Sequence, residues 1–575
     1  MILRALYDYY YRSGNLPARG MELKEIGFII VIDKNGRFLR FEDRRTNKKN
    51  AQQFLVRKSV SRSSAPLANY LYDNSQYVFG YSDKGSMESM RKYFDTFKAK
   101  IDEINSLYPE NKDIKTVYAF YQQEPDNLVE AMQQDPLWPD IIKNLKKKYS
   151  LFSFLIEGDS EIVASKQNLL NLENEDSTTI SSGKTCLITG KPSKTVDITT
   201  ATMIPGSQAT AKLVAFQVNS GYDSYGKSKG DNAPISEQAE FAYTTALNHL
   251  LRSDSHNKFM VGTRTFLFWA SSNSKASRAS EDSMFALFGR SEQEDDDPNE
   301  RIEEVYRTFM SIYNGKLPTD KNDQFFILGL APNSARISVV YWSELPLREF
   351  AGLISKHFED MRIVDTRKNK KPYVGLHAIL SSITLGGKSS EVTPNIPDAL
   401  VKSIFQGLPY PASLFQACIR RIRAEQSVNI VRAAILKAYL NRLRNQNNHK
   451  ILNEMLDKEN QNQGYLCGRL FAVLEKIQED ANGIHTIRDR YMNSASATPA
   501  AVFATILNLS AHHLEKLNDG AQVYYEKLKQ EIISKLNADG FPAHLDLQDQ
   551  GRFFVGYYHQ RQDLFTKKEN KETED

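Results

Sequence analysis

The spacing of hydrophobic residues changes after residues 408–411, where two prolines follow one another closely. Before this point, short apolar runs that fit strands alternate with segments of helical spacing. From Ser413 onward the apolar residues recur every three or four positions, which is the pattern of packed helices. We therefore predict an α+β fold. Mixed α/β N-terminal and central regions are expected to be followed by a C-terminal all-α helical bundle.

The length of the chain requires more than one domain. Its 575 residues are too many for a single hydrophobic core. Residues 172–183 are polar and rich in Ser and Thr, and prolines cluster between residues 397 and 411. We therefore predict three regions: an N-terminal α+β region at residues 1–175, a central α+β region at 184–400 and the helical bundle at 408–575.

The N-terminal region contains clear signals for individual elements. Asn35-Gly36 predicts a tight hairpin turn with both residues at positive φ. Apolar periodicity predicts helices at residues 3–10 and 87–104 and a further helix at 140–149. The predicted strands are residues 26–32, 37–41, 117–121 and 151–156.

In the rest of the chain, Thr498 is a predicted helix N-cap with Pro499 at the first helical position. Residues 553–560 are expected to close the bundle. Two polar segments, 271–283 and the acidic run 292–297, are predicted to be exposed linkers. The remaining predictions are a helix at residues 236–251 and strands at 212–218, 265–270, 325–330 and 336–342.

Composition argues against several classes of protein. Cys186, Cys418 and Cys467 lie far apart and form no CxxC pair, so we expect neither a disulfide framework nor a thiolate zinc site. The first residues lack the pattern of a signal peptide. No run approaches the roughly 18 apolar residues of a membrane span. We therefore expect a cytoplasmic protein without a membrane partner.

Residues 54–80 combine three features of a nucleic-acid contact. The segment begins with basic residues, which hold phosphates, and continues with amides, which reach base edges. Its tyrosine rings can stack on bases or wedge between them. The candidate contacts are Lys58 and Arg62 for phosphates, Asn74 and Gln76 for bases, and Tyr72 and Tyr77 for stacking. The alternative, which composition alone favours, is a buried strand containing Leu71, Tyr77, Val78 and Phe79, with its turn at Asp73-Asn74.

Two basic runs and one loop are further candidates. Residues 34–62 contain ten Lys or Arg against two acids, and residues 411–450 contain eight against one. The simpler interpretation of each run is a solvent-exposed surface without a binding role. The loop at residues 222–232 is rich in Gly, Lys and Tyr, and an alternative role for it is a rigid turn. The candidate residues are Tyr225, Lys227 and Asn232 in the loop and Arg420, Arg421, Arg423, Arg432, Arg442 and Arg444 on the first bundle helices.

No local motif for catalysis is present in the sequence. Gly183-Lys184-Thr185 lacks the first glycine of a phosphate-binding loop. The histidines are scattered, and the adjacent pair His512-His513 points in different directions on a helix. We therefore predict no catalytic residues, no metal site and no cofactor. A metal-dependent nuclease with dispersed active-site residues and a pure scaffold remain the alternatives.

Several stretches together resemble one family, the large subunit of the type I-C CRISPR interference complex, called Cascade. They follow one another in family order, although the segment at residues 215–219 departs from the family's SFN-like pattern. The stretches are MILRALYDYY (1–10), LYDNSQYVFG (71–80), CLITGKPS (186–193), LVAFQVNSGYDSYGKSKGDNAPIS (213–236), AYTTALNHLL (242–251), TFLFWA (265–270), LGLAPNSARISVVYW (328–342), YLCGRLFAVLEKIQ (465–478), SASATPAAVF (494–503) and FFVGYYHQRQ (553–562).

The resemblance implies a non-enzymatic subunit of an RNA-guided complex. Such subunits act in the prokaryotic cytoplasm, where they recognise the protospacer-adjacent motif in double-stranded DNA, help to open the strands and stabilise the R-loop. They also recruit the helicase-nuclease, while base pairing recognises the sequence. The resemblance also implies the partners: guide crRNA, target double-stranded DNA, the backbone, RNA-processing and small subunits of Cascade, and a helicase-nuclease effector. The C-terminal bundle is similar to the small subunit of such complexes.

Overall fold

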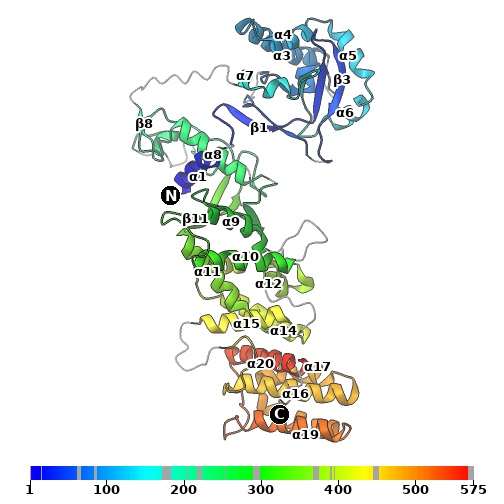
Figure 1. The fold of residues 1–575 in the computed structure, drawn as a ribbon, viewed down its shortest axis with the longest axis vertical. Coiled ribbons are helices and arrows are strands. Elements are labelled where there is room, and N and C mark those ends of the chain that lie inside the picture. Colours follow the sequence, from blue (N-terminus) through cyan, green and yellow to red (C-terminus); the bar gives the residue numbers. More distant parts are fainter. Residues whose placement is uncertain are drawn as a thin grey trace. The chain divides into compact units, whose positions relative to one another are not determined.

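The chain forms two compact units in the computed structural model (Figure 1). The N-terminal unit comprises Ser13–Thr195 and Pro234–Thr245, and the main unit comprises Met1–Arg12, Val196–Ala233 and Ala246–Asp575. The predicted α+β class is confirmed, with helices dominating the C-terminal region. The structure describes residues 2–14, 16–48, 50–60, 66–82, 87–170, 183–202, 204–216, 223, 225–252, 254–288, 298–366, 374–388, 391–393, 395–443 and 452–566.

A four-stranded sheet with the order β3-β2-β6-β5 forms the centre of the N-terminal unit. Strand β2 (Phe28–Ile32) pairs antiparallel with β3 (Phe38–Asp43) and parallel with β6 (Leu151–Ile156). Strand β6 pairs antiparallel with the short β5 (Tyr72–Asn74). All five residues of β2 are buried, which explains why its sequence is continuously apolar.

The hairpin between β2 and β3 differs in detail from the prediction. Gly36 has a φ of +79°, but Asn35 is not at positive φ. The turn is instead held by Asp33, whose Oδ1 accepts hydrogen bonds from the backbone N–H of Asn35 and of Arg37. Gly36 packs so closely on helix α4 (Lys112–Tyr121) that an added Cβ would clash with backbone atoms there.

The helices of the N-terminal unit pack around this sheet and share one hydrophobic core with it. The predicted helix at residues 87–104 is confirmed as α3, and the predicted helix at 140–149 is shorter and ends at Asn144. A second ribbon pairs β1 (Met21–Glu25) with β4 (Gln53–Arg57). The helices are α2 (Ser75–Val78), α3 (Met87–Leu107), α4 (Lys112–Tyr121), α5 (Pro125–Gln133), α6 (Trp138–Asn144) and α7 (Gln167–Leu170).

The predicted strand at residues 117–121 is wrong, because these residues end helix α4. The helix begins after Asn111, whose side chain accepts hydrogen bonds from the backbone N–H groups of Asp113 and Ile114. Its buried residues, which include Val117 and Phe120, recur at helical spacing. A window limited to residues 117–121 contains mostly β-favouring residues and hides this period.

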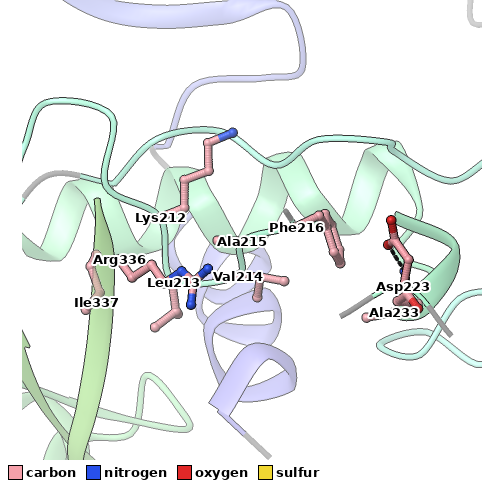
Figure 2. A pocket seen from close by; sticks show the side chains of 10 residues that line it. Lys212, Leu213, Val214, Ala215, Phe216, Asp223, Ala233, Arg336 and Ile337 are labelled. Carbon is pink, nitrogen blue, oxygen red and sulfur yellow. Dashed lines mark hydrogen bonds between the residues drawn. The ribbon is translucent and has the colours of Figure 1, made fainter. Parts of the chain in front are cut away.

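The main unit contains a second four-stranded sheet, with the order β12-β11-β10-β9. Three predicted strands are confirmed, as β10 (Arg264–Ala270), β11 (Gln324–Asn333) and β12 (Arg336–Pro346), and β9 (Lys258–Val261) is added at the edge. The predicted strand at 212–218 is wrong over its described part, since only Lys212 forms an isolated bridge to β12 (Figure 2). Residues 217 and 218 lie outside the described residues.

The polar segment at residues 271–283 is also not a linker. Helix α9 (Lys275–Met284) begins at the N-cap Ser274, whose side chain accepts a hydrogen bond from the backbone N–H of Ser277. Ser277 and Ser280 are fully buried. Small hydroxyl side chains allow this helix to pack closely, so the composition of the segment misleads. The acidic run at 292–297 lies outside the described residues.

Helices make up most of the main unit. The predicted N-cap Thr498 is confirmed in position, but its hydroxyl donates to the carbonyl of Ser494 instead of capping the helix. The helices are α1 (Ile2–Ser13), α9 (Lys275–Met284), α10 (Pro298–Tyr313), α11 (Leu347–Met361), α12 (Leu376–Ser382), α13 (Asn395–Phe405), α14 (Ala412–Glu425), α15 (Ile430–Arg442), α16 (Gln463–Asn482), α17 (Thr486–Ala497), α18 (Pro499–Leu514), α19 (Asp519–Ile533) and α20 (Leu547–Phe565). Helix α8 (Glu237–Leu250) belongs to the N-terminal unit up to Thr245 and to the main unit from Ala246.

Helices α16 and α20 are the closest pair in the main unit, and glycines make this possible. An added Cβ at Gly468 would overlap the carbonyl oxygen of Phe553, and one at Gly556 would overlap that of Tyr465. One continuous hydrophobic core runs from Phe259 to Tyr558. This core contains residues of both the central region and the helical bundle.

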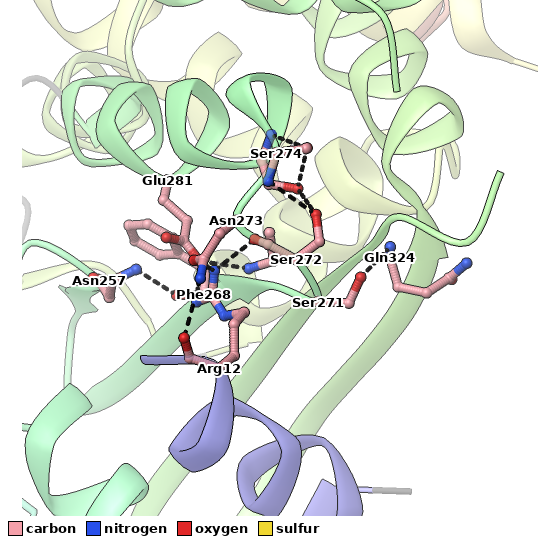
Figure 3. A network of polar contacts seen from close by, with 11 residues as sticks. Arg12, Asn257, Phe268, Ser271, Ser272, Asn273, Ser274, Glu281 and Gln324 are labelled. Atoms are coloured by element: carbon pink, nitrogen blue, oxygen red, sulfur yellow. Dashed lines mark hydrogen bonds and ion pairs between the residues drawn. The ribbon is translucent and has the colours of Figure 1, made fainter. Parts of the chain in front are cut away.

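The first helix of the chain is held on the rest of the main unit by a partly buried ion pair (Figure 3). The guanidinium of Arg12 donates to Glu281 Oε1 at 2.8 Å and to the carbonyl of Ser272 at 2.7 Å. The same Glu281 oxygen accepts from the backbone N–H of Ala270, and Asn273 donates to the carbonyl of Arg12. Burial raises the pKa of Glu281, and Arg12 opposes this effect.

Candidate nucleic-acid interface

Tyr72 is a core residue and not an exposed stacking ring. Its side chain is fully buried, and its hydroxyl lies 2.9 Å from the carbonyl oxygen of Arg57 and 3.0 Å from Ser59 Oγ. Glu22 Oε1 lies 3.2 Å from the same hydroxyl, and burial raises the pKa of Tyr72 well above its usual value. The stacking role expected for Tyr72 is therefore contradicted in this structure.

The same correction applies to Tyr77. Its ring is 3% exposed and packs against Tyr93 with centroids 5.0 Å apart. Val78 and Phe79 are buried beside it, as the alternative interpretation of residues 54–80 predicts. The segment forms the single helical turn α2, however, and not the strand expected by that interpretation.

Asn74 and Gln76 each have a polar side-chain atom engaged inside this segment and a second one that points to remaining hydrogen-bonding capacity. Asn74 Oδ1 caps α2 by accepting from the backbone N–H of Gln76 at 3.1 Å. Gln76 Nε2 donates to Ser82 Oγ at 3.0 Å. Both side chains are half-buried, and within the described residues no hydrogen bond occupies Asn74 Nδ2 or Gln76 Oε1. A donor and an acceptor therefore remain available to an incoming group.

Residues 58–60 form a strap held on the N-terminal unit. Asn69 Oδ1 accepts from the backbone N–H of Val60 at 2.9 Å, and Ser59 donates to Glu22 through both its backbone and its hydroxyl. Burial alone raises the pKa of Glu22, but these bonds outweigh it and the pKa lies below its usual value. The strap leaves the Lys58 side chain exposed. Arg62, the other predicted phosphate contact here, lies outside the described residues.

The strand register brings separate parts of the chain to one end of the first sheet. The register aligns four residues in one row across the sheet: Asp43 of β3, Phe28 of β2, Phe152 of β6 and Asp73 of β5. The chain therefore leaves β3 and β5, and enters β2 and β6, at the same end. We call it the lysine end. Asn74 is the first residue beyond this row on β5.

Three exposed lysines gather at the lysine end. Lys147 and Lys148 precede β6, and Lys48 follows β3. The carbonyl of Lys48 lies 3.5 Å from the hydroxyl of Tyr149, which places the two lysine-bearing turns side by side. From β5 to β3 the sheet spans three strand spacings, about 14 Å. Amide groups and exposed lysines therefore lie at the same end of the sheet, an arrangement that suits a nucleic-acid backbone and its base edges.

Three arginines of the first basic run pair with acidic side chains. Arg40 and Arg44 pair with Glu42, and Arg45 pairs with Asp43 and Asp140. The hydrogen bonds from Arg45 hold the pKa of Asp43 below its usual value. Four exposed cations of this run form no ion pair within the described part of the chain: Lys34, Arg37, Lys48 and Lys58.

The loop at residues 222–232 is firmly built where it is described. Asn232 Nδ2 donates to Asp223 Oδ1 at 2.9 Å and to the carbonyl of Lys229 at 3.1 Å. Asn232 therefore holds the loop from inside. Lys227 is exposed, and Tyr225 is 97% exposed.

The predicted basic face of the helical bundle is not a continuous surface. Arg432 is 4% exposed and donates to the carbonyls of Ser382 and Ser427, while Arg442 is 9% exposed and pairs with Asp360. These two arginines hold the fold together, which contradicts their predicted role. Arg421 pairs with Glu425, Arg423 donates to Gln550, Arg420 is exposed, and Arg444 lies outside the described residues.

Residues 183–193 form a small hairpin of β7 (Lys184–Thr185) and β8 (Pro192–Ser193). This is not the strand-to-helix geometry of a phosphate-binding loop. Cys186 is buried at the turn and accepts a hydrogen bond from the backbone N–H of Ser236. Burial raises the pKa of Cys186, but hydrogen bonds from Ser236 and Thr189 outweigh it and lower the pKa to about 7.

No group of three or more His, Cys, Asp or Glu side chains is arranged to hold a metal ion in the described part of the chain. None of its helices is both long and apolar enough to cross a membrane.

The comparison with protein families identifies the class of protein. Residues 6–565 match the model of a family described as CRISPR-associated protein (Cas_Csd1), which covers nearly the whole chain. The chain therefore belongs to this family, the Csd-type large subunit of the type I-C Cascade complex. No protein among the curated sequences matches it.

Proposed function

We propose that this chain is the subunit of its complex that recognises the short duplex beside the target, and that it does so with the lysine end of the first sheet. The observation that supports this proposal most directly is the strand register, which places Asn74, Lys48, Lys147 and Lys148 at the same end of the first sheet. Membership of a Cascade subunit family supports a role beside DNA. In RNA-guided systems the protein recognises only a short motif.

Each group at the lysine end has a separate role in this proposal. Asn74 Nδ2 donates to a base acceptor, and Gln76 Oε1 accepts from a base donor, which together select the motif. The three lysines neutralise phosphates and set the position of the duplex without selecting its sequence. Tyr72, Glu22 and Ser59 do not touch DNA but fix the segment that carries the amides.

The finer steps follow from this placement. Binding of the flanking duplex helps to open the neighbouring strands, and pairing with the guide RNA stabilises the open state as an R-loop. The chain itself performs no bond chemistry, and a helicase-nuclease partner degrades the DNA. The alternative is a metal-dependent nuclease assembled from distant residues. Incubation of the chain with Mg²⁺ or Mn²⁺ and labelled DNA distinguishes the two, because cleavage abolished by a point substitution contradicts the proposal.

The test of motif recognition is Asn74→Ser in the assembled complex. Serine is a good N-cap, so this variant keeps α2 while removing the amide. The ratio of affinities for motif and scrambled duplexes should fall by about 5- to 150-fold, the equivalent of one lost base contact. Asn111→Ser is the matched control, since Asn111 caps α4 in the same way and lies outside the lysine end. An unchanged ratio in a folded Asn74→Ser complex rules out this role for Asn74.

A further inference from the structure

Strand β12 lies at the edge of the second sheet and is long for an edge strand. The sheet has the order β12-β11-β10-β9, so β11 pairs with one side of β12 and the other side is the edge of the sheet. At 11 residues, β12 is about twice the mean strand length of roughly 5–6 residues. Natural proteins usually keep edge strands short or cover them, because an open edge can pair with another chain.

The backbone of β12 shows which groups point away from β11. The N–H of Ile337 donates to the carbonyl of Lys212 at 3.2 Å, on the side opposite β11. Because this orientation alternates along a strand, the N–H and C=O of Val339 point the same way. Among the described residues, no backbone hydrogen bond reaches residues 338–343 from that side. Val339 is also 44% exposed, so the edge is open at this point.

The two faces of β12 are already packed, which leaves its edge as the place for a further contact. On one face, the ring of Tyr341 packs against Phe266 with centroids 6.3 Å apart. Trp342, the next residue, points to the other face and packs against Trp269 at 5.9 Å. A further partner of this strand therefore has to approach through the backbone edge.

A cavity of about 390 Å³ lies beside the start of this edge (Figure 2). The segment that follows Lys212 forms one bridge to β12 and, in the described part of the chain, no second one, and the cavity opens between the two. Its volume lies within the roughly 300–1,000 Å³ of ordinary ligand pockets. Most of the lining residues are apolar: Leu213, Val214, Ala215, Phe216, Ala233 and Ile337.

We propose that an extended segment of a partner protein adds to β12 as a further strand and places an apolar side chain in this cavity. The open N–H and C=O groups alternate at the spacing of a polypeptide strand, so another strand complements them and nucleic acid does not. In strand addition, main-chain hydrogen bonds give affinity and pockets for alternate side chains give specificity. A Cascade subunit works among other protein subunits, which favours a different chain over a second copy as the occupant.

The direct test is hydrogen exchange of the backbone amide of Val339, measured in the full-length chain alone and in the assembled complex. Strand addition should slow this exchange by about tenfold or more, because the amide becomes hydrogen-bonded. Met260 is the matched control, since it is also 44% exposed and lies on β9, at the opposite edge of the same sheet. Its exchange should change less than about twofold.

Variants of the edge and of the cavity test the same contact by affinity. Val339→Pro removes an N–H that points away from β11, so the pairing inside the sheet is kept. Affinity for the complex assembled without this chain should fall by about fivefold or more, the equivalent of one lost main-chain hydrogen bond. Ala215→Trp, at an exposed lining position, should also weaken binding by filling the cavity. Val339→Thr keeps the N–H and should change affinity less than about twofold.

Photo-crosslinking from position 339 in the complex identifies the occupant. Crosslinks to one segment of one partner subunit are the expected result. Crosslinks confined to residues 213–216 of this chain, to a second copy or to nucleic acid overturn the inference. Equal exchange of the Val339 amide in the free chain and in the complex overturns it as well, whether or not Val339→Pro folds.

Discussion

Neutralising the lysine end should reduce the salt dependence of duplex binding in a calculable way. The perturbation is the triple variant Lys48→Ala, Lys147→Ala and Lys148→Ala. All three side chains are exposed and form no ion pair within the described residues, so each is available for one phosphate. Their removal should leave stability within about 0.5 kcal/mol, because surface substitutions away from special contacts have small effects.

The magnitude follows from counterion release. Each phosphate contact contributes about 0.9 to the slope of log affinity against log salt, so three contacts contribute about 2.7. Between 50 and 200 mM salt, a fourfold change, this slope corresponds to about 40-fold in affinity. The parent complex should therefore lose about 40-fold more affinity than the triple variant over this range. Fluorescence anisotropy with a labelled duplex that carries the motif measures both slopes.

The chain supplies a matched control at the other end of the same sheet. Lys34 and Arg37 are exposed cations in the β2–β3 hairpin, opposite the lysine end. Lys34→Ala with Arg37→Ala should leave the slope unchanged. The reasoning is refuted if the triple variant has the same salt-dependence slope as the parent. It is also refuted if the hairpin variant and the triple variant show the same decrease in slope for each positive charge removed.

Three further predictions concern the residues that hold the fold. Gly468→Ala should destabilise the chain by about 3 kcal/mol or more in denaturant unfolding, because the added methyl overlaps the Phe553 carbonyl and forces α16 and α20 apart. Arg12→Ala should cost about 1–3 kcal/mol at pH 7, since it leaves the partly buried Glu281 carboxylate without its cation. Burial raises the pKa of Glu281 in the folded state, so the stability of this variant should fall as pH rises above about 4.5, the pKa of the unfolded state. If the variant loses the same stability relative to the parent at pH 4 and at pH 7, the assignment is contradicted. Tyr72→Phe should lower stability by about 1 kcal/mol through its lost hydrogen bonds while leaving motif discrimination intact, whereas a drop in discrimination at full stability would favour a direct contact with DNA.

The periodicity of apolar residues predicts those elements of the fold that are determined by residues close together in the sequence. Residues 26–32 and 151–156 are apolar because their strands lie in a covered sheet, and α3 has a regular apolar face. The prediction of secondary structure fails where polar residues are buried, and where an apolar stretch is too short to show its period. Ser277 and Ser280 lie inside the core of the main unit, and the aromatic residues of 117–121 end a helix.

The candidate site was only partly predictable for a different reason. Asn74 and Gln76 stand out in the sequence, but the lysines that join them come from two other segments. Their common position depends on the parallel pairing of β2 with β6, which links residues about 120 positions apart. The run at residues 146–148, directly before a predicted strand, is the only local signal. The same limit applies to Arg432 and Arg442, whose burial depends on partners far along the chain.

The most direct test of the account locates the DNA that touches the lysine end. A photo-crosslinking residue in place of Gln76, in the complex bound to target, is mapped against DNA labelled at successive positions. The account predicts crosslinks confined to the duplex that flanks the target, lost when the motif is scrambled. Crosslinks confined to the guide-paired segment, or a pattern unchanged by scrambling, would contradict it.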